Sequence, residues 1–160
     1  IIISLPFEEP DVEIQDLYDE PFEVLIPAEH PLAKQEKVTR KQLEKENILM
    51  LGEGHCFRDQ VLNACPGILK HSDETSLPQG TSLETLRHMV ASGLGITILP
   101  SSSSDKHIYD SDTLVERPFA GKTPYRRVSL VWRKRFSRPK AIAALVQAIT
   151  SCALQGAASV

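Results

Sequence analysis

Two cysteines, Cys56 and Cys65, stand nine residues apart in the stretch EGHCFRDQVLNACP. Cys56 follows a glycine-containing turn and begins a helical pattern, so the unpaired N–H groups and the dipole of the helix start would favour its thiolate. A thiolate attacks a peroxide oxygen and becomes a sulfenic acid, which a second thiol can trap as a disulfide. His55 and Arg58 add nearby positive or hydrogen-bonding groups. The pattern therefore predicts a reactive cysteine at position 56.

Cys65 cannot reach Cys56 while the helix between them is intact. Nine helical residues rise about 13 Å and turn the side chain to about the opposite face, whereas a disulfide needs Cα atoms within about 7 Å. Joining the two sulfurs would require most of FRDQVLNA to unwind. This spacing predicts a redox switch, in which a covalent event changes the local fold.

Other interpretations of the cysteines remain open at this point. Cys65 ends an apolar stripe and could be a small buried hydrophobic residue. A metal site could include His55, Cys56 and Cys65. A complete site needs four ligands, however, and the other histidines are scattered along the chain. We therefore expect no metal and no cofactor. Cys152 lies in the C-terminal helical pattern and is interpreted as structural.

Composition limits the class of protein. The chain has 160 residues, of which 24% are charged, and a net charge of −3, which indicates a soluble globular chain and not a nucleic-acid binder by bulk charge. It has no apolar run of 18 residues that could span a membrane. Three cysteines, an odd number, favour a reducing compartment such as the cytoplasm. The basic run 125–140 is either a solvated face or a surface for phosphate or a partner.

Strand and helix patterns alternate along the chain. Apolar or alternating runs predict strands at 1–6, 12–17, 21–27, 47–51, 96–100, 113–119 and 125–133. Helices are predicted after Thr39, from Cys56 to the Pro66–Gly67 stop, after Thr81 or Ser82, and from Arg138 onwards, the last with Ile142, Leu145, Val146 and Ile149 on one face. This order predicts an α/β domain with a largely parallel sheet.

Two long motifs carry a resemblance to a known family. LGEGHCFRDQVLNACP and GTSLETLRHMVASGLGITILP, together with LYDEPFEVLIPAEHPLA at 17–33, resemble the regulatory domain of the OxyR family, the peroxide-sensing group of LysR-type transcriptional regulators. The resemblance covers essentially the whole chain and weakens after about residue 140. It implies that Cys56 is the peroxide-reactive cysteine and Cys65 the resolving one.

The resemblance also implies roles for other side chains. Arg127 would lie near the reduced sulfur and stabilise its thiolate, and the helix at 83–91 would belong either to a dimer surface or to the core. The remaining residues of the implied sensing pocket and effector cleft are His55, Arg58, Asp59, Gly54, Thr81 and Ser82. The segment between Cys65 and Thr81 is slightly longer than the family pattern.

The implied fold is periplasmic-binding-protein-like, with two subdomains and parallel-rich sheets. About 20–115 would form the second subdomain, and 1–19 with 116–160 would form part of an incomplete first subdomain, the DNA-binding domain lying outside this chain. The implied partners are hydrogen peroxide, further copies of the chain as a dimer or tetramer, and glutaredoxin or thioredoxin as reductant. Operator DNA and RNA polymerase would be contacted only by the intact protein.

Two hypotheses of other classes stay open. A thiol peroxidase would use the same attacking and resolving cysteines, but the Thr and Pro that peroxiredoxins place ahead of the cysteine have no counterpart here. A small-molecule-binding effector domain would share the fold but would not explain the second cysteine. The sequence favours a sensor over an enzyme.

Overall fold

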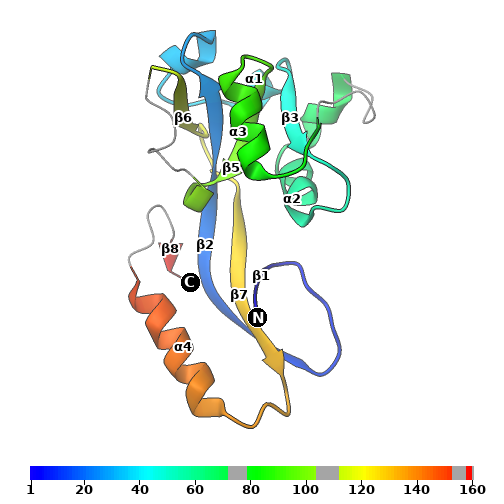
Figure 1. Cartoon of the computed structure of the whole chain (residues 1–160), viewed down its shortest axis with the longest axis vertical. Coiled ribbons are helices and arrows are strands. Elements are labelled where there is room, and N and C mark those ends of the chain that lie inside the picture. Colours follow the sequence, from blue (N-terminus) through cyan, green and yellow to red (C-terminus); the bar gives the residue numbers. More distant parts are fainter. Residues whose placement is uncertain (72–78, 104–111, 153–157, 160) are drawn as a thin grey trace. The chain divides into compact units, whose positions relative to one another are not determined.

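The computed structural model describes residues 1–71, 79–103, 112–152 and 158–159. The chain divides into two compact units (Figure 1): unit 1 consists of Ile1–Pro21 and Tyr125–Val160, and unit 2 of Phe22–Pro124. Helices and strands occur in both, so the α/β class is confirmed. None of the described helices is long and apolar enough to cross a membrane.

The sheet of unit 2 is mixed. Strand β3 (Ile48–Leu51) pairs in parallel with β4 (Gln79–Gly80) and β5 (Ile96–Pro100). Strand β2 (Val12–Pro27) pairs antiparallel with β5 and with β6 (Leu114–Pro118). Among the described strands of unit 2, parallel pairing joins those connected through helices, whereas β2 and β6 bring the chain into and out of the unit. The sheet is less parallel than the sequence suggested.

The helices of unit 2 begin where the sequence predicted. Thr39 and Gln42 form a capping box on α1 (Arg40–Leu43), and Ser82 caps α3 (Leu83–Ala91) by accepting a hydrogen bond from Thr85 N at 3.1 Å. Helix α2 (Cys56–Ala64) lies beside β3 (Figure 1) and is followed by the 3-10 helix η2 (Pro66–His71). Two further 3-10 helices, η1 and η4, span Pro31–Lys34 and Ser101–Ser103.

The apolar stripe of α3 belongs to the core of unit 2. Leu86 and Val90 are buried, and Leu83 and Met89 pack partly buried against the same core. Of the two interpretations of this helix, the structure therefore supports core packing for the stripe. The exposed side chains of α3 include Glu84 and His88.

Unit 1 is built on one continuous strand where the sequence predicted two. The first ten residues of β2, up to Pro21, pair antiparallel with β7 (Tyr125–Arg133). Pro21 lacks an N–H to donate, but Phe22 N already donates to Pro124 O at 2.9 Å, so pairing continues past the proline. The proline therefore does not end the strand.

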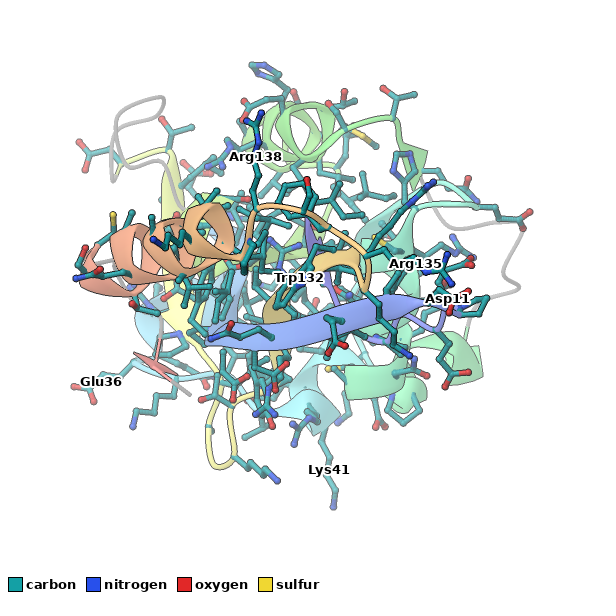
Figure 2. The ribbon with its side chains drawn as sticks, turned by 90° about the horizontal axis from the view of Figure 1, so that it is seen from below. Asp11, Glu36, Lys41, Trp132, Arg135 and Arg138 are labelled. Atoms are coloured by element: carbon teal, nitrogen blue, oxygen red, sulfur yellow. The ribbon has the colours of Figure 1, made fainter. Side chains whose placement is uncertain are left out.

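Two apolar segments of unit 1 are only partly buried. Strand β1 (Ile2–Ser4) pairs with β7 alone among the described strands, and Ile2 is 52% exposed, because β1 lies at the edge of the sheet. Helix α4 (Pro139–Ser151) buries none of its residues, and its side chains Ile142 and Leu145 face a groove that β7 also lines through Trp132 (Figure 2). The described part of the chain covers these two faces only in part.

Three further features are Cys152, strand β8 and the connection between Cys65 and Thr81. Cys152 is exposed and follows the last residue of α4; its interpretation as structural stays a prediction. Strand β8 (Ala158–Ser159) pairs with β2. The long connection between Cys65 and Thr81 falls partly on 72–78, outside the described residues.

Candidate functional site

The predicted site residues around Cys56 and Ser82 follow two neighbouring strands at one edge of the unit 2 sheet. Strand β3 leads through residues 52–55 into α2, and β4 leads through Thr81 and Ser82 into α3. Because the two strands are parallel, their carboxyl ends meet at the same edge, which is where ligands bind in open α/β sheets. Gly52 N donates to Gly80 O at 3.1 Å and ties the two loops together. The segments around Cys56 and Ser82 are therefore neighbours.

Cys56 occupies the first turn of a helix that no side chain caps. His55 stands at the N-cap position of α2 without a side-chain cap bond, whereas Thr39 and Ser82 cap the other helices of this unit. Gly54 has a φ of +88°, a conformation that glycine adopts without strain, and it turns the chain into the helix. Cys56 is an exposed free thiol. An uncapped helix start beside an exposed sulfur favours negative charge there.

The opposite face of α2 is anchored in the core. Phe57, Val61 and Cys65 follow at intervals of four residues and are all buried. The Phe57 ring meets the ring of Phe22 edge-on, with centroids 5.2 Å apart and planes at 79°. Cys56 and Cys65 therefore lie at opposite ends and on opposite faces of one intact helix, as predicted, and both are free.

Cys65 is held in an apolar setting with two charged neighbours. Only 2% of its surface is exposed. Burial raises the pKa of the Cys65 thiol, the charge and hydrogen bond of Arg40 lower it, and the charge of Glu44 raises it further; the net shift is upward. Cys65 is consequently a protonated and unreactive thiol in this fold. No local sequence pattern could indicate these neighbours, since they lie more than twenty residues upstream.

The other predicted residues of the 55–59 segment divide between core and surface. Arg58 is 5% exposed, and its Nη1 donates to Leu51 O at 3.3 Å, so its guanidinium fastens the first turn of α2 to β3. His55 and Asp59 are exposed on the loop and helix start. A direct role for these three side chains towards peroxide stays a prediction.

Arg127 belongs to unit 1, where carboxylates surround it. Its Nε and Nη2 donate to the two carboxylate oxygens of Asp19 at 2.8 and 2.9 Å, and its Nη1 donates to Asp16 at 3.1 Å. The hydrogen bonds that Arg127 donates to Asp19 hold the pKa of Arg127 above its usual range. Cross-strand register explains the pairing, since Asp19 lies directly opposite Arg127. The predicted place of Arg127 beside the Cys56 sulfur stays a prediction.

A second ion pair of unit 1 was missed at the sequence level. Arg126 Nε donates to Glu20 Oε2 at 2.6 Å, and Glu20 is only 1% exposed. Within the basic run, Arg126 and Arg127 therefore have carboxylate partners on β2. The described residues hold no cluster of three side chains suited to a metal ion.

Comparison with known proteins decides the family. The model of the LysR substrate-binding domain matches residues 1–153. The chain belongs to this family. Among solved structures, a reduced form of OxyR from Neisseria meningitidis is 40% identical with a TM-score of 0.91, over 99% of this chain and 74% of that one. The reduced OxyR regulatory domain of Pseudomonas aeruginosa is 46% identical with a TM-score of 0.82, over 94% and 71%. Within the LysR family, the chain groups with the OxyR regulatory domains.

Curated relatives are named as hydrogen peroxide-inducible genes activators or as OxyR. The hydrogen peroxide-inducible genes activator of Pectobacterium carotovorum is 41% identical over 117 residues, which make up 73% of this chain and 38% of that protein. The DNA-binding transcriptional dual regulator OxyR of Escherichia coli is 41% identical over 117 residues, 73% of this chain and 37% of that protein. The chain thus spans about two fifths of the length of these relatives.

Proposed function

We propose that this chain senses hydrogen peroxide as part of the regulatory domain of a LysR-type transcriptional activator. The observation that carries the proposal is the placement of two free thiols on one helix. Cys56 is exposed at the uncapped start of α2, and Cys65 is buried at its other end. Membership of the OxyR group supports peroxide as the oxidant, since a cysteine mutant of OxyR from Corynebacterium glutamicum is described as H2O2-bound.

The chemistry proceeds in two balanced steps. The Cys56 thiolate attacks one peroxide oxygen, the O–O bond breaks, and the departing hydroxide takes a proton to leave as water, so that Cys56 becomes a sulfenic acid. Cys65 then attacks the sulfenic sulfur, its thiol proton joins the departing hydroxide, and a second water leaves as the disulfide forms. Peroxide is reduced by two electrons and the pair of thiols is oxidised by two.

The second step is what converts oxidation into a signal. Cys65 must leave the core to meet Cys56, and Phe57 and Val61 lie on the same anchored face between them. Helix α2 cannot remain intact around the bond, because its two ends are about 13 Å apart along the axis. The disulfide therefore exchanges one packed arrangement of residues 56–65 for another.

The intact protein would use this change to activate transcription. Relatives are named as hydrogen peroxide-inducible genes activators and as a DNA-binding regulator. We propose that the protein of which this chain is a part works as a homo-oligomer on operator DNA and with RNA polymerase. Cytoplasmic dithiol proteins of the glutaredoxin or thioredoxin class would return it to the dithiol form, in a compartment that keeps thiols reduced.

Peroxide consumption separates a sensor from a thiol peroxidase. With excess peroxide and a thioredoxin-type reductant supplied in limiting amounts, we expect about one equivalent of peroxide to be consumed rapidly per protein, followed by slow turnover set by refolding of the oxidised segment. The measurement is peroxide loss by stopped flow, with the Cys56–Cys65 disulfide followed by mass spectrometry. Sustained turnover that rises in proportion to reductant concentration would instead identify an enzyme.

A further inference from the structure

The resolving cysteine has a docking site of its own on α1. Helix α1 contacts η2, the segment that begins directly after Cys65. The contact is apolar at its centre, where Leu43 and Ile68 are buried. Two charged residues of the same segment, Arg40 and Glu44, act on the Cys65 thiol.

Arg40 is the cation of this docking site. Its Nη2 donates to Lys122 O at 3.0 Å, and its positive charge lowers the pKa of the Cys65 thiol. Its Nε is buried with no hydrogen-bond partner among the described residues. A buried donor without an acceptor is costly, and a thiol is a weak acceptor whereas a thiolate is a strong one. The Arg40 side chain therefore suits the charged form of Cys65 better than the neutral one.

Glu44 provides the opposing charge one helical turn later. Its carboxylate lies directly over Gly67, in the space that any Cβ at that position would fill. Gly67 thus allows the acidic side chain to approach the main chain two residues after Cys65. Among the described residues, Arg40 and Glu44 are the charged groups that act on the Cys65 thiol.

We propose that Arg40 is a positioning residue of the redox pair, which seats the Cys65 sulfur in the reduced fold and receives it as a thiolate when the disulfide is cleaved. This inference rests on the proposed function. In the reduction, one external thiolate attacks the Cys56 sulfur and expels the Cys65 sulfur as a thiolate. A second external thiol then releases Cys56, so that two external thiols become one disulfide. The expelled thiolate must return to a position that is almost fully buried. Loss of hydration opposes this return, and the positive charge of a nearby guanidinium favours it.

The thiol–disulfide equilibrium of the Cys56–Cys65 pair tests the proposal. The full-length protein is equilibrated in a thiol redox buffer at pH 7 and at pH 9.5, and the disulfide fraction is determined by alkylation and peptide mass mapping. Arg40→Gln should shift the equilibrium constant towards the disulfide by about threefold at pH 7, the net effect of one hydrogen bond. The shift should be at least twice as large at pH 9.5, because more Cys65 is ionised there. Arg40→Lys should restore most of the pH-dependent part.

Lys41→Gln is the matched control, since it removes the same charge from the next residue of α1, where the exposed side chain points outwards (Figure 2). It should leave both equilibrium constants unchanged. A shift in Arg40→Gln that is equal at the two pH values would reduce Arg40 to a packing role and overturn the proposal. A second measurement does not depend on disulfide formation. In a Cys56→Ser background, Arg40→Gln should raise the pKa of Cys65, measured by an alkaline titration of its thiolate. If the unmutated protein forms no Cys56–Cys65 bond, both the proposed function and the Arg40 inference fail. An unchanged titration overturns the Arg40 inference alone.

Discussion

Replacing Cys56 with serine is expected to abolish the response to peroxide. A serine hydroxyl at this position has no accessible anionic form near neutral pH, so the attack on the O–O bond loses its nucleophile. We expect the rate of protein oxidation by a single equivalent of peroxide to fall by at least about a thousandfold, to the level of an unactivated thiol. The measurement is the time course of dimedone-trapped sulfenic acid and of disulfide, both located by mass spectrometry.

Cys65→Ser should give a contrasting result in the same experiment. Cys56 is still exposed at the helix start, so sulfenic acid should form at the unmutated rate and then persist, because no second thiol condenses with it. Cys152→Ser provides the control, since it removes an exposed thiol beyond α4 and should change neither step. If sulfenic acid appears first at Cys152, or at Cys65, the assigned roles are wrong.

Phe57→Ala should make the conversion of sulfenic acid to disulfide much faster. Phe57 is 7% exposed and packs edge-on against Phe22, so it holds the first turn of α2 in the core. Loss of a buried phenylalanine side chain lowers the stability of a fold by about 3–5 kcal/mol. The contacts of Phe57 must break when α2 unwinds, so their absence lowers the activation barrier of disulfide formation by part of this energy. We expect the second step to accelerate by roughly 10- to 100-fold, with the first step unchanged, as followed by rapid acid quench.

A second buried phenylalanine separates this effect from general destabilisation. Phe119 is 2% exposed in the same core but lies beside Val38, away from α2. Phe119→Ala should lower the free energy of unfolding by a similar amount without accelerating disulfide formation. Equal acceleration in both variants would show that the whole of unit 2, and not α2, opens during the reaction.

Local spacing predicted the parts of the site that a single helix determines. The nine-residue interval predicted that the two thiols lie on opposite faces of the helix, and the structure confirms this. A buried Cys65 at the end of an apolar stripe was one of the interpretations left open, and the structure shows that burial. The Thr39–Gln42 capping box was also readable, because both partners are three residues apart. Short-range patterns such as these depend on helix geometry alone.

Features that depend on distant segments could not be predicted in this way. Arg40 is adjacent to Cys65 only because α1 packs on η2, and no periodicity links residues 25 positions apart. Asp19 pairs with Arg127 through the register of β2 and β7, which the sequence leaves open. The four apolar residues on one face of α4 could be recognised from their spacing, but the spacing could not reveal that the described chain covers that face only in part.

Hydrogen exchange of the amides of residues 57–64 tests the central claim most directly. The full-length protein is compared before and after one equivalent of peroxide, with the Cys56–Cys65 bond confirmed in the same sample. The account predicts strong protection of these amides in the dithiol form and its loss in the disulfide form, while the amides of β3 and β5 stay protected in both. Unchanged protection of residues 57–64 in a sample that carries the disulfide would contradict it.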